Sequence, residues 1–159
     1  MDSRPFGFTR FLEWILALIA AVDCLGVAVT FGISQIRVSA TPGSTPDLGL
    51  IWPLPAIYLF EVALIGIIAF IIVAVFPGLS FHERNAYLWI SSGVLLAFVI
   101  LGVFSIGLFL IPATLALLII ALLRDISEKI PLALHITMWV SAALIQGLLV
   151  YGVAFSTSF

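Results

Sequence analysis

Long apolar blocks alternate with short polar segments along the chain. The first block runs approximately over residues 11–33, the second over 55–76, and the last over 131–155. Between the second and the last lie 38 consecutive residues, Ala86 to Leu123, without a charged side chain. About 20 apolar residues cross the roughly 30 Å hydrocarbon core of a bilayer as a helix. Every block is therefore long enough to form a transmembrane helix.

The uncharged run from Ala86 to Leu123 is too long for one span, because a straight helix of that length would measure roughly 57 Å at about 1.5 Å per residue. Its weakest point is the segment Gly102–Gly107, since glycine lowers helix propensity, and Pro112 follows closely. A turn there predicts a hairpin of two rather short helices. The expected spans are thus 11–33, 55–76, 87–101, 108–123 and 131–155.

The connections are predicted from their polar composition. Residues 34–49 are rich in Pro, Gly and Ser, which is typical of a loop. Residues 80–85 form a short polar connection, and residues 124–130 form the most highly charged segment of the chain.

The distribution of Lys and Arg favours five spans over four, because these residues collect on the cytoplasmic side of a membrane. With five spans and a cytoplasmic N-terminus, only Arg37 lies outside. The inner segments then hold the other basic residues: Arg4, Arg10, Arg84, Arg124 and Lys129. A four-span fold would give three basic residues on each side. A re-entrant or interfacial segment in place of one helix is the remaining alternative.

Composition supports an all-α integral membrane protein with a single transmembrane domain over residues 1–159. Hydrophobic residues make up 64% of the chain and charged residues 9%, whereas soluble domains carry about 25% charged residues. The first block could pass for a signal peptide, but it is longer than a typical one and lacks a clear cleavage site, so we expect a retained helix. The net charge of −2 gives no basic surface for nucleic acid.

The sequence contains no recognisable catalytic or metal-binding motif. Cys24 is the only cysteine, so an internal disulfide and a CxxC pair are both excluded. The patterns HExxH and GxSxG are absent. His82 and His135 are the only histidines, and their surroundings do not resemble those of haem ligands. We therefore expect no enzyme activity, no cofactor and no metal site.

Polar residues at similar depth in three spans suggest an intramembrane cluster. Asp23 lies near the middle of the first span, while Glu61 and Gln146 lie about five and three residues from the middle of theirs, both toward the outer side. Tyr58 is three residues from Glu61 and so shares its helix face. An ionisable residue at this depth costs about 2.5–3.5 kcal/mol on insertion scales, which makes it a functional candidate.

Two interpretations of this cluster stay open. Two carboxyl groups close together in a low dielectric repel each other when both are ionised, so one is expected to hold a proton, as a proton-coupled carrier requires. Alternatively, each carboxyl group is structural and forms a hydrogen bond with a neighbouring helix, or it contacts a charged group on another subunit.

Glu13 and His135 form a second candidate pair near the cytoplasmic ends of their spans. A histidine beside a carboxylate can transfer protons near neutral pH. The alternative is that both side chains are hydrated in the headgroup region and anchor their helices there.

These features give three functional hypotheses. The leading one is a small non-enzymatic subunit or self-associating component, whose partners are the lipid bilayer and either another membrane protein or a second copy. Small residues at four-residue spacing, as in Ala143-x-x-x-Gly147, fit close helix packing. The second is a small proton- or cation-coupled transporter or channel that uses Asp23 and Glu61. The third, an enzyme acting on a lipid or quinone, lacks a catalytic constellation. With no organelle signal in the sequence, we expect a bacterial cytoplasmic membrane.

Overall fold

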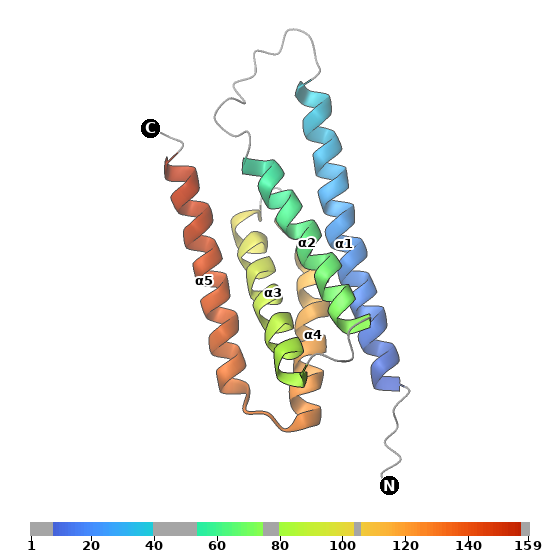
Figure 1. The fold of residues 1–159 in the computed structure, drawn as a ribbon. Helices are drawn as coiled ribbons and strands as arrows, with labels where there is room; N and C mark the ends of the chain where they lie inside the picture. Colours follow the sequence, from blue (N-terminus) through green and yellow to red (C-terminus); the bar gives the residue numbers. More distant parts are fainter. Residues whose placement is uncertain (1–7, 40–53, 75–79, 104–105, 157–159) are drawn as a thin grey trace.

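The structure is a computed structural model that describes residues 8–39, 54–74, 80–103 and 106–156, and within these residues it is an all-helical bundle (Figure 1). Five α-helices are long and apolar enough to cross a membrane, which indicates an integral membrane protein. The α-helices are α1 (Phe8–Ser39), α2 (Leu54–Ala74), α3 (Phe81–Leu101), α4 (Ile111–Glu128) and α5 (Leu132–Ser156). A 3₁₀ turn, η2 (Gly107–Leu110), leads into α4.

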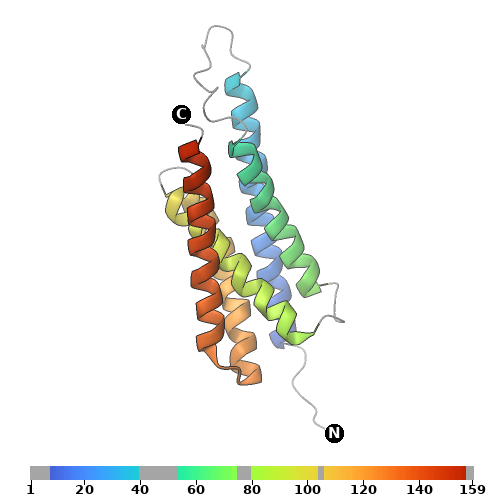
Figure 2. The same ribbon diagram turned by 60° about the vertical axis from the view of Figure 1, so that its left-hand side comes forward.

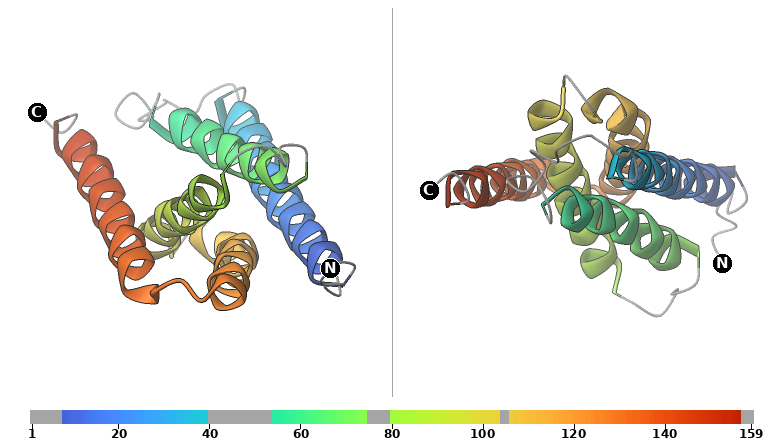
Figure 3. Two further views of the ribbon diagram at one scale, coloured as in Figure 1. Left: turned by 60° about the horizontal axis from the view of Figure 1, so that its bottom comes forward. Right: turned by 90° about the horizontal axis from the view of Figure 1, so that it is seen from above.

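Helix α3 joins the two sides of the bundle. It packs against α4 and α5, while α1 packs against α2 and α4. Figure 2 shows α3 crossing obliquely beside α5, and Figure 3 shows α5 at the outer edge of the bundle, on the side opposite α1. The first turn of α1 and the last turn of α5 lie at opposite ends of the bundle, as expected for an odd number of spans (Figure 1).

The long uncharged run is divided into a hairpin, as the glycines predicted. Helix α3 ends at Leu101, and the N–H group of Gly107 donates to the carbonyl oxygen of Gly102 over 2.7 Å. A Cβ atom on Gly107 would lie 2.6 Å from the carbonyl carbon of Gly102, so only glycine permits this approach. Residues 104–105, within the predicted turn, lie outside the described residues.

Helix α3 begins earlier than the sequence analysis expected, since residues 81–85 are helical and not part of a connection. The reason is a capping box. The backbone N–H of Glu83 donates to Ser80 Oγ over 3.3 Å, and the backbone N–H of Ser80 donates to Glu83 Oε2 over 3.1 Å. These two bonds satisfy amide groups that a helix N-terminus leaves without partners. The helix is therefore 21 residues long, which is enough to cross a membrane.

Two further boundaries differ from the prediction. Helix α4 continues through Glu128, although residues 124–130 were expected to form a charged connection, because its buried face continues from Ile120 and Ala121 to Arg124 and Asp125. It ends at Lys129, whose backbone is left-handed with φ 55°. Residues 34–39 extend α1 into the predicted loop, and residues 40–49 of that loop lie outside the described residues.

Small side chains allow the helices to approach closely. The face of α1 that packs against its neighbours presents Ala17, Ala20 and Cys24, all fully buried. A Cβ atom added to Gly66 of α2 would lie 2.7 Å from Cys24 Cβ, so these two helices are in close contact. Because lipid removes most of the hydrophobic drive for helix association, such close packing holds the bundle together.

Candidate functional site: a buried carboxylate that joins three helices

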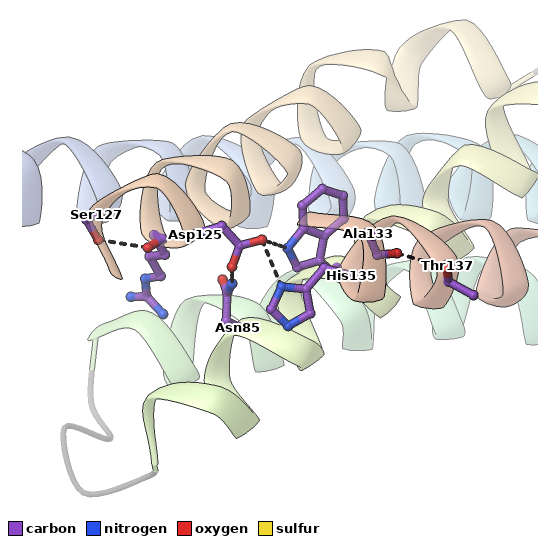
Figure 4. Close-up of polar contacts among 8 residues, drawn as sticks. Asn85, Asp125, Ser127, Ala133, His135 and Thr137 are labelled. Atoms are coloured by element: carbon purple, nitrogen blue, oxygen red, sulfur yellow. Dashed lines mark hydrogen bonds and ion pairs between the residues drawn. The ribbon is translucent and has the colours of Figure 1, made fainter. Parts of the chain in front are cut away.

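The most highly connected polar group in the described part of the chain is the carboxylate of Asp125, near the C-terminal end of α4 (Figure 4). Asn85 Nδ2 donates to its Oδ1 atom. Its Oδ2 atom accepts from Trp89 Nε1 over 3.0 Å and lies 2.8 Å from His135 Nδ1. One carboxylate thus binds residues of α3 and α5 from its position on α4. We call these four residues the Asp125 network.

The Asp125 network is fully enclosed by protein. Asn85 and His135 have no exposed surface, and Trp89 and Asp125 are 2% and 1% exposed. A buried charge is costly unless it is paired and hydrogen-bonded, and each oxygen of this carboxylate has at least one partner. Asn85 and Trp89 reach it together because residues four apart lie on the same helix face.

The His135 ring is held in one orientation by its surroundings. It stacks on the Trp89 indole with centroids 6.0 Å apart, and the His82 ring lies 5.7 Å away. A hydrogen on Nδ1 lets His135 donate to Asp125, as Asn85 and Trp89 do. Its Nε2 atom is buried without a hydrogen-bond partner. The contact between His135 and Asp125 fastens α5 to α4.

Glu13 and His135 were predicted as a pair, and the structure gives each a different partner. Glu13 Oε2 forms an ion pair with Arg124 Nη2 over 2.7 Å, which links α1 to α4. His135 contacts Asp125 instead. The side chain of Arg124 is 3% exposed and that of Glu13 is 16% exposed, so this ion pair is removed from solvent. The proton-transfer role proposed for Glu13 with His135 has no support in this geometry.

The predicted intramembrane cluster is divided between two places. Asp23 Oδ2 accepts a hydrogen bond from the backbone N–H of Ala113 over 3.1 Å. Ala113 lies in the first turn of α4, where amide groups lack helical partners and the helix dipole favours negative charge. Asp23 therefore caps α4 from α1.

Glu61 and Gln146 do meet, as their depth suggested. Gln146 Nε2 donates to Glu61 Oε2 over 3.1 Å, and this bond links α2 to α5. Tyr58 lies on the same side of α2 and packs its ring against Phe98 of α3, with centroids 5.7 Å apart. Glu61 and Gln146 thus form the part of the predicted cluster that a hydrogen bond joins.

Two substitutions of Asp23 test whether this residue acts as a hydrogen-bond acceptor for α4 or through its negative charge. In Asp23→Asn an oxygen remains to accept from Ala113, so we expect the apparent Tm in detergent to change little. In Asp23→Leu the amide of Ala113 loses its partner, at a cost of about 1–3 kcal/mol. Val22→Leu, at an exposed neighbouring position, is the control. An equal loss in the Asn and Leu variants would show that the charge itself is required.

Helix α5 contacts the rest of the bundle through two buried polar residues as well as through its packing on α3. Among its described residues only His135 and Gln146 are buried, and both are polar. They are eleven residues apart, which places them on one face after about three turns. Each contacts a carboxylate on a helix other than α3, namely Asp125 on α4 and Glu61 on α2. Two polar contacts thus supplement the packing of α5 on α3.

Asn85 and Asp125 were not predicted as site residues because residues 80–85 and 124–130 were expected to form connections. Trp89 lies within the predicted span 87–101, and nothing in its local sequence indicated a polar partner. A signal for Asp125 was present, since Leu117, Ala121 and Asp125 follow the four-residue spacing of one helix face. Comparison with protein-family models, curated proteins and solved structures gives no match for the chain.

Proposed function

We propose that the protein is a non-catalytic subunit of a membrane assembly and that α5 carries the contact with the neighbouring chain. The observation that supports this proposal is the exposure of α5, which packs mainly on α3 and has only two buried residues among those described. Its remaining surface is apolar and includes Leu144, Leu148 and Tyr151, which are 62%, 70% and 67% exposed.

Two glycines on α5 strengthen the proposal. A Cβ atom added to Gly147 or Gly152 would meet nothing within 4 Å. Glycine in a helix costs about 1 kcal/mol relative to alanine, and packing within this chain does not require it at either position. Small residues on a transmembrane helix let the backbone of another helix approach closely. A helix from a neighbouring chain could approach closely at Gly147, which lies beside Leu144 and Leu148 on the surface of α5.

The intramembrane carboxyl groups fit a structural role. Asp23 caps α4, Glu61 accepts from Gln146, and Asp125 binds three side chains. Each therefore stabilises contacts between helices of this chain. In this proposal the end of the bundle that carries Arg10, Arg84, Arg124 and Lys129, which we call the basic end, faces the cytoplasm of a bacterial cell.

Extraction from the native membrane tests the proposal. A tagged protein taken up with a membrane-solubilising polymer should be found in a particle that contains further protein, and mass spectrometry should identify it. A different chain in fixed ratio would define a hetero-complex, and further copies of this chain would define self-association. A particle that contains one 17.2 kDa chain and lipid alone would contradict the proposal.

Proton- or cation-coupled transport is a second candidate, favoured by the contact between Glu61 and Gln146. Protonation of Glu61 would remove its charge and weaken one of the two polar contacts that hold α5, so proton binding could be coupled to movement of this helix. Reconstitution in liposomes with a pH-sensitive dye tests this alternative. Flux that is lost in Glu61→Gln, at unchanged protein yield, would establish transport. Flux equal to that of protein-free liposomes is the result expected for a subunit.

A further inference from the structure

A cavity of about 450 Å³ opens at the basic end between α1, the end of α2 and the start of α3. We call it the basic-end cavity. Its polar lining consists of Arg10, Glu13 and Arg84, and its apolar lining consists of Phe11, Trp14, Val73 and Ala74. The volume lies within the range of about 300–1,000 Å³ that is common for small-molecule sites.

The cations around this cavity outnumber the carboxylate that faces them. Arg10 and Arg84 line it together with Glu13. Glu13 forms its ion pair with Arg124, which lies outside the lining. The only carboxylate among the described residues of the lining is therefore already engaged, and Arg84 is repelled by Arg124 and Arg10.

One arginine of the cavity lining, Arg84, has a buried donor without a partner among the described residues, and so has the nearby Arg124. Arg84 Nε has no hydrogen-bond partner in the described part of the chain, and the same is true of Arg124 Nη1. Arg124 is 3% exposed, so water cannot readily compensate. Leaving a charged donor unpaired costs more than leaving a neutral one, and an anion with several oxygen atoms in the cavity would give Arg84, which lines it, the missing acceptor.

The depth and the walls of the cavity define the anion further. Arg10, Glu13 and Arg84 lie within about five residues of the same ends of their spans, which is roughly 7.5 Å along a helix. That level corresponds to the boundary between headgroups and acyl chains. Phe11 and Trp14, which are 63% and 47% exposed, supply an apolar surface beside the charges. The arrangement suits a ligand with an anionic head and an apolar body.

We propose that the basic-end cavity binds a phosphate group, with Arg84 as its main ligand-binding residue and with an anionic phospholipid as the amphiphile that fits the apolar wall. Arginine presents a fork of N–H donors that matches phosphate geometry. Basic pockets between transmembrane helices on the cytoplasmic side are known to hold such headgroups.

Binding is tested with the purified full-length chain in detergent, titrated with short-chain phosphatidylglycerol or phosphatidylcholine and followed by native mass spectrometry. We expect at least tenfold tighter binding of the anionic lipid. Arg84→Gln should weaken this binding at least fivefold, and Arg84→Lys should weaken it less. Equal affinity for the two lipids would overturn the proposal.

Lys129→Asn is the matched control, because it removes one exposed cation at the same end of the bundle but outside the cavity. Asparagine also tolerates the left-handed backbone at this position. We expect its affinity for phosphatidylglycerol to change less than twofold. A loss equal to that of Arg84→Gln would mean general attraction to a basic surface and would overturn the assignment to the cavity.

Two further measurements separate a binding residue from a structural one and distinguish the source of the phosphate. Without lipid, Arg84→Gln should keep or raise the apparent Tm, because it removes a half-buried charge that is repelled by its neighbours. A marked loss would make Arg84 structural and overturn the proposal. Inorganic phosphate is then added to the complex with the short-chain lipid. Displacement at millimolar concentration would support a soluble phosphate compound as the ligand, and retention would support the phospholipid.

Discussion

Replacement of Asp125 by leucine is expected to cause one of the two largest losses of stability in the chain. It would leave Asn85 Nδ2, Trp89 Nε1 and His135 Nδ1 without the acceptor they share. Removing one partner of a buried, hydrogen-bonded charge typically costs about 3–5 kcal/mol. We expect little folded protein at 37 °C and a much lower apparent Tm, measured by size-exclusion chromatography after heating.

Asparagine at this position should be nearly as harmful, because its NH₂ group would face one of the three donors. Glu128→Gln is the control, since Glu128 is exposed and lies on the same helix. It should leave the apparent Tm unchanged. An apparent Tm of Asp125→Leu equal to that of this control would show that the Asp125 network does not hold the helices together.

A methyl group at Gly93 is expected to push α3 and α5 apart. A Cβ atom there would lie 2.5 Å from the backbone oxygen of Trp139 and 3.2 Å from Ala142 Cβ, and a backbone atom cannot move away as a flexible side chain can. Overpacking of this kind costs about 1–3 kcal/mol. Gly93→Ala should therefore lower the apparent Tm, and Gly93→Leu should lower it further.

Gly147→Ala on α5 provides the comparison, because a Cβ atom at this position meets nothing within 4 Å. In the isolated chain we expect no loss, or a gain of up to about 1 kcal/mol from higher helix propensity. In the native membrane the same variant should weaken association with the neighbouring chain. Equal destabilisation of the isolated chain by Gly93→Ala and Gly147→Ala would show that close contact at Gly93 is not what holds α5.

Hydropathy, the glycines Gly102 and Gly107 and the distribution of Lys and Arg were together sufficient to predict five helices and the division of the Ala86–Leu123 run, because all three can be read directly from the chain. The ends of the helices were harder to predict. Residues 81–85 and 124–128 are polar and were assigned to connections, yet a capping box and a continuing buried face keep them helical. In a membrane protein, polarity near the end of a span does not by itself mark the end of the helix.

The contacts within the candidate site could also be predicted only in part. The similar depths of Glu61 and Gln146 in their helices were enough to predict that these two residues meet. Depth could not separate Asp23 from them, because that requires knowing that α1 packs beside the start of α4. The partners of Glu13 and His135 likewise depend on which helices are neighbours, and a single sequence does not contain that information.

Site-specific photo-crosslinking in the native membrane would show directly whether α5 contacts another chain. A photoreactive amino acid is placed at Leu144 or Leu148 on α5, and for comparison at Val22 on α1 or Phe60 on α2, which are similarly exposed. We predict protein adducts from both α5 positions and only lipid adducts from the other two. Lipid adducts alone at all four positions, or protein adducts at equal yield from all four, would contradict assembly through α5.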